Sequence, residues 1–147
     1  SAVMPATLCS SDEQVFVVDP AILKHSTLLN TFESFTEPIS LPNVTGGILQ
    51  LVIEWLEHHK NDPVEEIDDT AEIIIPQWDS AFFAPLQYTM KLPEIIVAAN
   101  YLDIKKLVSM GCKAIANTFK GKTGAQIREE WNSDAWMSND ESDWNVE

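Results

Sequence analysis

The chain has 147 residues and a formal net charge of −14, with nine Lys and Arg against 23 Asp and Glu. A chain of this length fits one domain with a short appendage and can bury a sizeable apolar core. The negative charge repels phosphate backbones and anionic lipid headgroups, so we expect no nucleic-acid partner and no membrane partner. Simple solubility and binding to a basic protein explain such a charge about equally well.

The two cysteines, Cys9 and Cys112, lie far apart and form neither a CxxC pair nor a zinc-ligand spacing. This usage favours a reducing compartment. The first seven residues lack the basic region and apolar run of a signal peptide, and every apolar stretch is shorter than a membrane span. We therefore expect a soluble protein of the cytoplasm and nucleus.

The N-terminal part of the chain predicts a small sheet. The β-prone runs at residues 7–9 and 15–18 flank a polar turn and predict a hairpin. Asp19-Pro20, a capping residue followed by proline, predicts the start of an α-helix that ends at Phe35. Residues 39–41 lie between two prolines and predict a short third strand at an edge of the sheet.

The remaining elements are predicted to be helices. Residues 48–60 carry apolar side chains at helical spacing and predict an amphipathic helix. The acidic segment 61–75 predicts an exposed, mobile loop, and residues 78–83 a short helix. Pro93 opens a helix through residue 102. Asp103 caps the next helix, over 104–120, which Gly121 ends.

The helix that starts at Pro93 has two apolar faces. One face has the spacing of a core stripe and consists of Ile95, Ala98, Ala99 and Leu102. The opposite side carries Val97, Asn100 and Tyr101, an apolar surface with a polar rim. A surface of this kind binds another protein, and a helix buried on both sides explains the pattern equally well.

The following helix has one continuous apolar stripe. It consists of Ile104, Leu107, Val108, Cys112, Ile115 and Phe119. Downstream, Thr123 and Gln126 form a capping box for a small helix through about residue 131. The acidic tail beyond it contains few aliphatic residues, but Trp131, Trp136 and Trp144 lie in this region. We infer that stripe and tail form a site completed by another chain; the alternative is a tail that folds back over the stripe.

The sequence predicts no catalytic residue, metal site or cofactor. Gly121-Lys122-Thr123 is not a phosphate-binding loop, because such a loop needs a glycine where Ala116 stands within a helix. His58 and His59 point in different directions on a helix and are interpreted as helix-end cations. Cys112 lies on the apolar stripe, where we expect a buried and inert thiol.

Ordered motifs along the chain resemble the S-phase kinase-associated protein (Skp) family, the adaptor subunits that join a cullin to F-box proteins in SCF ubiquitin ligases. The strongest match is Ala98-Ala99-Asn100-Tyr101-Leu102-Asp103-Ile104-Lys105, and Lys120-Gly121-Lys122-Thr123 follows in the family's order. Upstream, Leu41-Pro42-Asn43-Val44 and His58-His59-Lys60 also match. The similarity covers roughly residues 6–131.

The resemblance implies an α/β fold: a BTB/POZ domain over residues 1–103, with the acidic loop 61–75, and C-terminal F-box-binding helices with an acidic, Trp-rich tail over 104–147. It implies cullin binding by Val97, Asn100 and Tyr101. The residues that it implies for F-box binding are Ile104, Val108, Cys112, Ile115, Ala116, Phe119, Ile127, Trp131 and Trp144. Relatives carry a longer final helix, and Gly124 stands where they usually have proline.

The sequence therefore predicts a non-catalytic adaptor that bridges a cullin and F-box substrate receptors. The alternative is a self-associating BTB-type scaffold or an adaptor of the elongin C type, and a weak homodimer of the isolated chain belongs to the same set of expectations. An enzyme is the least supported hypothesis, because no catalytic constellation emerges.

Overall fold

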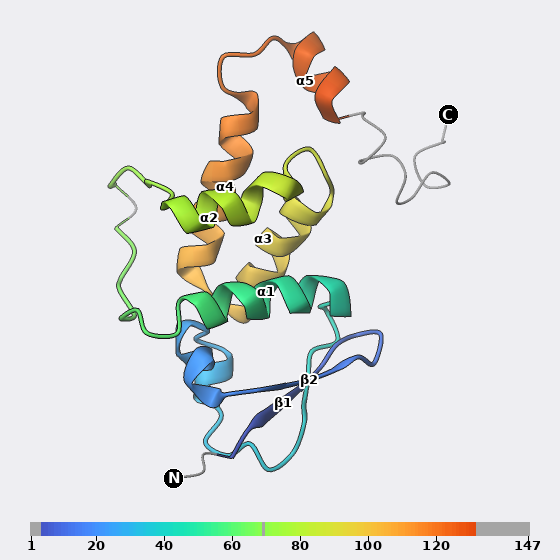
Figure 1. The fold of residues 1–147 in the computed structure, drawn as a ribbon, viewed down its shortest axis with the longest axis vertical. Helices are drawn as coiled ribbons and strands as arrows, with labels where there is room; N and C mark the ends of the chain where they lie inside the picture. The colour runs from blue at the N-terminus through green and yellow to red at the C-terminus, as the bar shows by residue number, and fades with distance from the viewer. Residues whose placement is uncertain (1–3, 69, 132–147) are drawn as a thin grey trace.

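The computed structural model describes residues 4–68 and 70–131 (Figure 1). A three-stranded sheet lies at one end, α1 crosses the middle, and α2, α3 and α4 lie on the other side of α1, with α5 at the far end. α1 therefore separates the sheet from the remaining helices. This is the mixed α/β arrangement that the sequence predicted.

The sheet has the order β2-β1-β3. β1 (Ala6–Cys9) pairs with β2 (Val15–Val18) in antiparallel fashion, and β3 (Ile39–Ser40) pairs with β1 in parallel. The predicted hairpin and the predicted edge strand are confirmed. Side chains alternate between the two faces of a strand, so Ala6 and Leu8 are buried while Val17 is exposed.

The hairpin turn fixes the start of α1 (Gly46–His58). The Asp12 carboxylate accepts a hydrogen bond from the Gly46 N–H at 2.8 Å. It satisfies one of the free amides at the helix start, which the preceding residue, Thr45, does not cap with its side chain. The predicted core stripe of this helix is confirmed: Leu49, Val52, Ile53 and Leu56 are all buried.

The segment after Asp19-Pro20 differs from the prediction. Instead of one α-helix it forms two 3₁₀ turns, η1 (Pro20–His25) and η2 (Leu29–Thr31). Asp19 caps the first turn as expected, with its side chain accepting from the Ala21 N–H at 2.9 Å. The N–H groups of residues 27 and 28 donate to carbonyls of residues 103 and 102 at the end of α3, so long-range bonds replace the helical ladder.

The C-terminal half contains α2 (Gln77–Phe83), η3 (Ala84–Leu86), α3 (Lys91–Leu102), α4 (Lys105–Phe119) and α5 (Gly124–Trp131). α3 begins two residues before Pro93, which lies in the first turn, where a proline removes no helical hydrogen bond. Asp103 does not cap α4 as predicted. It ends α3 in the left-handed conformation, with φ 57°, which Asp adopts more readily than most residues.

α3 and α4 pack closely because of one glycine. A Cβ at Gly111 would lie 2.7 Å from Cγ1 of Ile96 on α3. This helix pair gives α4 a buried face, formed by Leu107, Met110, Gly111, Ala114 and Thr118. The acidic segment between α1 and α2 contains neither helix nor strand among its described residues and is largely exposed. No described helix is long and apolar enough to cross a bilayer.

Candidate protein-interaction surfaces

The outward face of α3 is exposed, which decides between the two alternatives that the sequence left open. Ile95, Ala98, Ala99 and Leu102 form the buried face. On the opposite side Val97 is 66% exposed and Asn100 is exposed, while Tyr101 is half-buried and packs against the core. The structure therefore excludes a helix buried on both sides. We call Val97, Asn100 and Tyr101 the α3 surface.

A shallow hollow adjoins the α3 surface. It has a volume of about 200 Å³ and is lined by Asn43, Val44, Thr45, Ile48, Glu94, Val97 and Ala98. Val97 thus stands at the rim of a concavity to which the loop before α1 contributes. Sequence reasoning missed these loop residues, because their approach to α3 depends on the path of the chain after β3.

The predicted apolar stripe of α4 is divided between two faces. Ile104 and Leu107 are fully buried, so the expectation that Ile104 contacts a partner is wrong. Ile104 lies at the tight junction between α3 and α4, where its N–H donates to the Ala99 carbonyl at 2.8 Å. This turn directs the side chain into the core before α4 begins.

The rest of the predicted stripe reaches the surface in part, with Val108 and Ile115 also packing against the core. Val108 and Ile115 are half-buried, Cys112 and Ala116 are exposed, and Phe119 is 42% exposed. The prediction of a buried Cys112 thiol is wrong, because the helix buries a face rotated away from this residue. We call Val108, Cys112, Ile115, Ala116 and Phe119 the α4 surface.

α5 extends the α4 surface with aromatic and aliphatic side chains. The predicted capping box is confirmed: the Thr123 N–H donates to Gln126 Oε1 at 2.9 Å, and the Gln126 N–H donates to Thr123 Oγ1 at 3.1 Å. Ile127 and Trp131 are half-buried. The Trp131 ring stacks beside Phe119, with centroids 6.1 Å apart. Trp144, the last residue of the predicted F-box site, lies outside the described residues.

Lys122 holds α5 against Tyr88, in the turn between η3 and α3. Its Nζ donates to Glu130 Oε1 and to the Tyr88 hydroxyl, both at 2.7 Å. These two partners, Glu130 first, raise the pKa of Lys122 above its usual value. The Tyr88 ring also contacts Trp131 edge-on at 5.9 Å. The orientation of α5 relative to α4 is therefore set within this chain.

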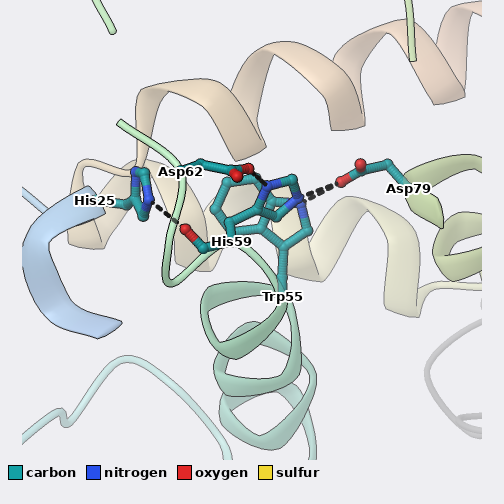
Figure 2. A network of polar contacts seen from close by, with 5 residues as sticks. All are labelled: His25, Trp55, His59, Asp62 and Asp79. Atoms are coloured by element: carbon teal, nitrogen blue, oxygen red, sulfur yellow. Dashed lines mark hydrogen bonds and ion pairs between the residues drawn. The ribbon is translucent and has the colours of Figure 1, made fainter. Parts of the chain in front are cut away.

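A buried polar cluster at the end of α1 was missed by sequence reasoning (Figure 2). His59 is 3% exposed, and its Nδ1 lies 2.6 Å from Asp62 Oδ2 while its Nε2 lies 2.8 Å from Asp79 Oδ1. Each ring nitrogen of His59 therefore faces a carboxylate oxygen. Trp55 Nε1 also donates to Asp79 Oδ1, at 2.7 Å.

This cluster connects four segments of the chain. His25 of η1 donates from Nε2 to the His59 carbonyl at 2.9 Å, and burial lowers the pKa of His25 below its usual value. The hydrogen bond from His59 lowers the pKa of Asp62. The spacing of His59 and Asp62 could have signalled their contact, but the approach of Asp79 could not be read from sequence. Only His58 behaves as an exposed helix-end residue, stacked on Trp78 at 3.8 Å.

The cluster is not a metal site. Within residues 4–68 and 70–131, no group of three His, Cys, Asp or Glu side chains is placed to hold a metal ion. Both ring nitrogens of His59 are already engaged with carboxylate oxygens, at 2.6 and 2.8 Å.

Comparison with known proteins gives a consistent result. Residues 5–61 match the model described as Skp1 family, tetramerisation domain, and residues 105–141 match Skp1 family, dimerisation domain. The chain is 43% identical over 135 residues to Suppressor of kinetochore protein 1 of Schizosaccharomyces pombe, covering 85% of this chain and 83% of that protein.

Two further relatives are named E3 ubiquitin ligase complex SCF subunit sconC. The protein of Talaromyces stipitatus is 44% identical over 134 residues, covering 86% of this chain and 82% of the relative. The protein of Talaromyces marneffei is 45% identical over 136 residues, with 86% and 82% covered. The matches span both the sheet-containing part and the C-terminal helices.

Proposed function

The chain belongs to the Skp1 family, and we propose that it is a non-catalytic adaptor subunit of an SCF-type ubiquitin ligase. The relatives named SCF subunits align with more than four-fifths of this chain, at 44% and 45% identity. An adaptor needs surfaces for two proteins. Among the described residues, the α3 surface and the α4 surface are the candidates for these two roles.

We assign the α3 surface to a cullin and the α4 surface, with α5, to an F-box protein. The observation that carries the proposal is the difference between the two sides of α4, where Leu107 is fully buried while Phe119 is 42% exposed. Exposed aromatic side chains beside half-buried aliphatic ones are typical of binding hot spots. On a different helix, α3, the side chain of Val97 lines a hollow and offers a second apolar surface to a partner.

The F-box assignment is tested by placing a charge on the α4 surface. We expect Phe119→Asp to weaken binding of a purified F-box domain by about 30-fold or more, because a carboxylate would be buried against an apolar partner. Phe32→Asp is a matched control, since Phe32 is 41% exposed but lies in the segment before β3. Equal binding by wild type and Phe119→Asp would reject the assignment.

The cullin assignment is tested on the two exposed positions of the α3 surface. We expect Val97→Lys/Asn100→Lys to lower affinity for a purified cullin N-terminal fragment by about 30-fold or more, with F-box binding unchanged. Tyr101 is left intact because it packs against the core. Val64→Lys, at a valine that is 61% exposed in the acidic segment, serves as the control. Cullin retention by the folded double variant would reject the α3 surface.

We also propose that the isolated chain forms a weak homodimer through the α4 surface. An apolar surface without its partner associates with a second copy, and the family description of residues 105–141 as a dimerisation domain supports this. Light scattering should then show a dimer that an F-box domain converts to a heterodimer. A stable homodimer that ignores the F-box domain would favour the scaffold alternative.

We place the protein in the cytoplasm and nucleus. Both thiols are accessible to reductant, with Cys112 exposed and Cys9 half-buried, and both are free. Such thiols persist in reducing compartments. Imaging of a tagged chain tests this placement, and accumulation in the secretory pathway would contradict it.

A further inference from the structure

The sheet has an uncovered edge and an uncovered face within the described residues. β2 is the end strand in the order β2-β1-β3. Its side chains alternate as expected: Val18 is buried, whereas Val15 and Val17 are 61% and 65% exposed. Their neighbours on β1, Cys9 and Thr7, are uncharged and half-buried. The outer face is therefore an apolar, uncharged strip at an open edge.

The backbone of β2 offers hydrogen bonds at the same two residues. The Ser10 N–H donates to the Gln14 carbonyl at 2.9 Å. Because bonded and non-bonded pairs alternate in an antiparallel ladder, Phe16 and Val18 bond to β1. The N–H and C=O groups of Val15 and Val17 then point away from β1. Such an edge accepts an additional strand.

The charges around β2 indicate what kind of strand fits. Residues 14–18 carry no charge, whereas Asp12 and Glu13 precede them and Asp19 follows. Hydrogen bonds from the Ser10 hydroxyl and the Gly46 amide lower the pKa of Asp12, which keeps it ionised. The only cation within ion-pair distance of these three carboxylates, among the described residues, is Lys60, whose Nζ lies 3.7 Å from Asp19 Oδ2.

This charge pattern disfavours a second copy of the chain. If two β2 strands paired in antiparallel fashion about Phe16, Glu13 of one copy would lie opposite Asp19 of the other. Like charges directly opposite destabilise a strand pair, and each copy carries a net charge of −14. A strand flanked by Lys or Arg would instead place opposite charges at both ends.

We propose that β2 is a docking strand for an extended segment of another protein, with aliphatic or β-branched residues at alternate positions and Lys or Arg at both ends. Backbone hydrogen bonds to Val15 and Val17 provide the register, and their side chains provide an apolar contact. This surface is at the opposite end of the molecule from α5 (Figure 1), so its occupation is compatible with F-box binding.

The proposal is tested with the peptide KKVTVTVKK and the full chain. Titration followed by ¹⁵N NMR should give saturable shifts centred on the amides of Val15 and Val17. The peptide EEVTVTVEE should bind roughly tenfold more weakly or worse, because it places carboxylates beside Glu13 and Asp19. A KKVTVTVKK peptide N-methylated at alternate residues along its bonding edge should not bind.

Variants of the chain identify the surface. Val15→Thr/Val17→Thr keeps β-branched residues but removes apolar area, and we expect affinity for KKVTVTVKK to fall roughly tenfold. Val64→Thr, at a valine of equal exposure outside the sheet, should bind as wild type. F-box binding should be unchanged in both variants. If the double variant fails to fold, the N-methylated peptide decides, because it leaves the protein unaltered.

Three results would overturn the proposal. The first is equal binding of the Lys-flanked and Glu-flanked peptides. The second is a set of shifts that centres on α4 rather than β2. The third is a chain that ignores both peptides but dimerises in a way that Val15→Thr/Val17→Thr abolishes, which would assign β2 to a second copy.

Discussion

The junction of α1 with α2 and the outer face of α4 use their side chains in opposite ways. At the junction the polar groups of Trp55, His59 and Asp79 are buried and bond to one another. On α4 the apolar groups of Ile115 and Phe119 are partly open to solvent. A buried polar group must find its hydrogen-bond partner within the chain. An exposed apolar group can instead be covered by another chain.

This difference predicts which residues determine stability and which determine binding. Removing a buried charge partner leaves the other charge unpaired, a large cost. Truncating an exposed apolar side chain removes little that the folded chain has buried by itself. The two regions should therefore respond oppositely to substitution: the junction in the free energy of unfolding, and α4 in affinity.

The largest expected effect is that of Asp79→Ala. Asp79 is 1% exposed and accepts from both Trp55 Nε1 and His59 Nε2. Its loss leaves Trp55 Nε1 and His59 Nε2 buried without their shared partner, so we expect the free energy of unfolding to fall by about 3–5 kcal/mol. Urea denaturation measures this. Asp68→Ala, in the exposed acidic segment, is the control and should leave the free energy of unfolding close to that of the wild type.

A loss below about 1 kcal/mol in Asp79→Ala would contradict this account of the junction, because two buried polar groups left without a partner cost more than that. Asp79→Asn refines the test. It keeps one oxygen as acceptor for Trp55 and His59, but places an amide where Oδ2 has no hydrogen-bond partner. We expect its cost to be smaller than that of Asp79→Ala.

Gly111→Ala should have a smaller effect than Asp79→Ala. The added Cβ would lie 2.7 Å from Cγ1 of Ile96 and 3.2 Å from its Cδ1, so α3 and α4 would have to separate or Ile96 would have to move. Overpacking typically costs about 1–3 kcal/mol, and the better helix propensity of alanine offsets up to about 1 kcal/mol. We expect a net loss of about 1–2 kcal/mol in thermal or urea unfolding.

A second substitution distinguishes this clash from other effects. In the double variant Gly111→Ala/Ile96→Ala the new methyl group has space, so the cost of Gly111→Ala should largely disappear against an Ile96→Ala background. Additive losses would show that Gly111 is needed for another reason.

Local patterns predicted the core of this fold well. The spacing of Leu49, Val52 and Ile53 and the buried face of α3 followed from helical periodicity alone, and the Thr123–Gln126 capping box from a local motif. The outward direction of Val97 followed from the same periodicity. These features depend on neighbours within about one helical turn, which a sequence displays directly.

Features that depend on distant contacts were not predictable. η1 and η2 replace an expected α-helix because amides of residues 27 and 28 bond to the end of α3. Ile104 faces inward because of the α3–α4 junction, and Cys112 faces outward because Gly111 sets the packing of α4. Both errors came from one assumption, that a long apolar stripe has a single partner. The partner-binding roles of the α3 and α4 surfaces remain predictions.

We expect the free energy of unfolding to fall gradually as the pH decreases, through the titratable groups at the junction of α1 with α2. Burial lowers the pKa of His25 below its usual 6.5, so the folded state disfavours the proton that the unfolded chain binds. Stability from His25 is complete above pH 6.5 and falls as the pH decreases through the interval between that value and the folded pKa. The pKa of Asp62 is also lowered, from 3.8, so its contribution is lost only at still lower pH.

Urea midpoints measured between pH 7.5 and 5 test the His25 contribution. We expect the wild-type midpoint to fall with decreasing pH, and the slope to be shallower in His25→Gln, whatever the absolute stability of that variant. His58→Gln provides the matched control, because His58 is exposed. An unchanged slope in His25→Gln would show that other groups cause the acid sensitivity.

The smallest effect on stability is expected at the α4 surface, and it tests the comparison most directly. Phe119→Ser should change the free energy of unfolding by less than about 1 kcal/mol, because this side chain is 42% exposed. Leu107→Ala, on the buried face of the same helix, should cost about 2–5 kcal/mol. In F-box binding the order should reverse: folded Leu107→Ala keeps its affinity, and Phe119→Ser loses it. If Phe119→Ser lowers the free energy of unfolding as much as Leu107→Ala does, then Phe119 is a core residue of this protein and is not part of a partner-binding surface on α4.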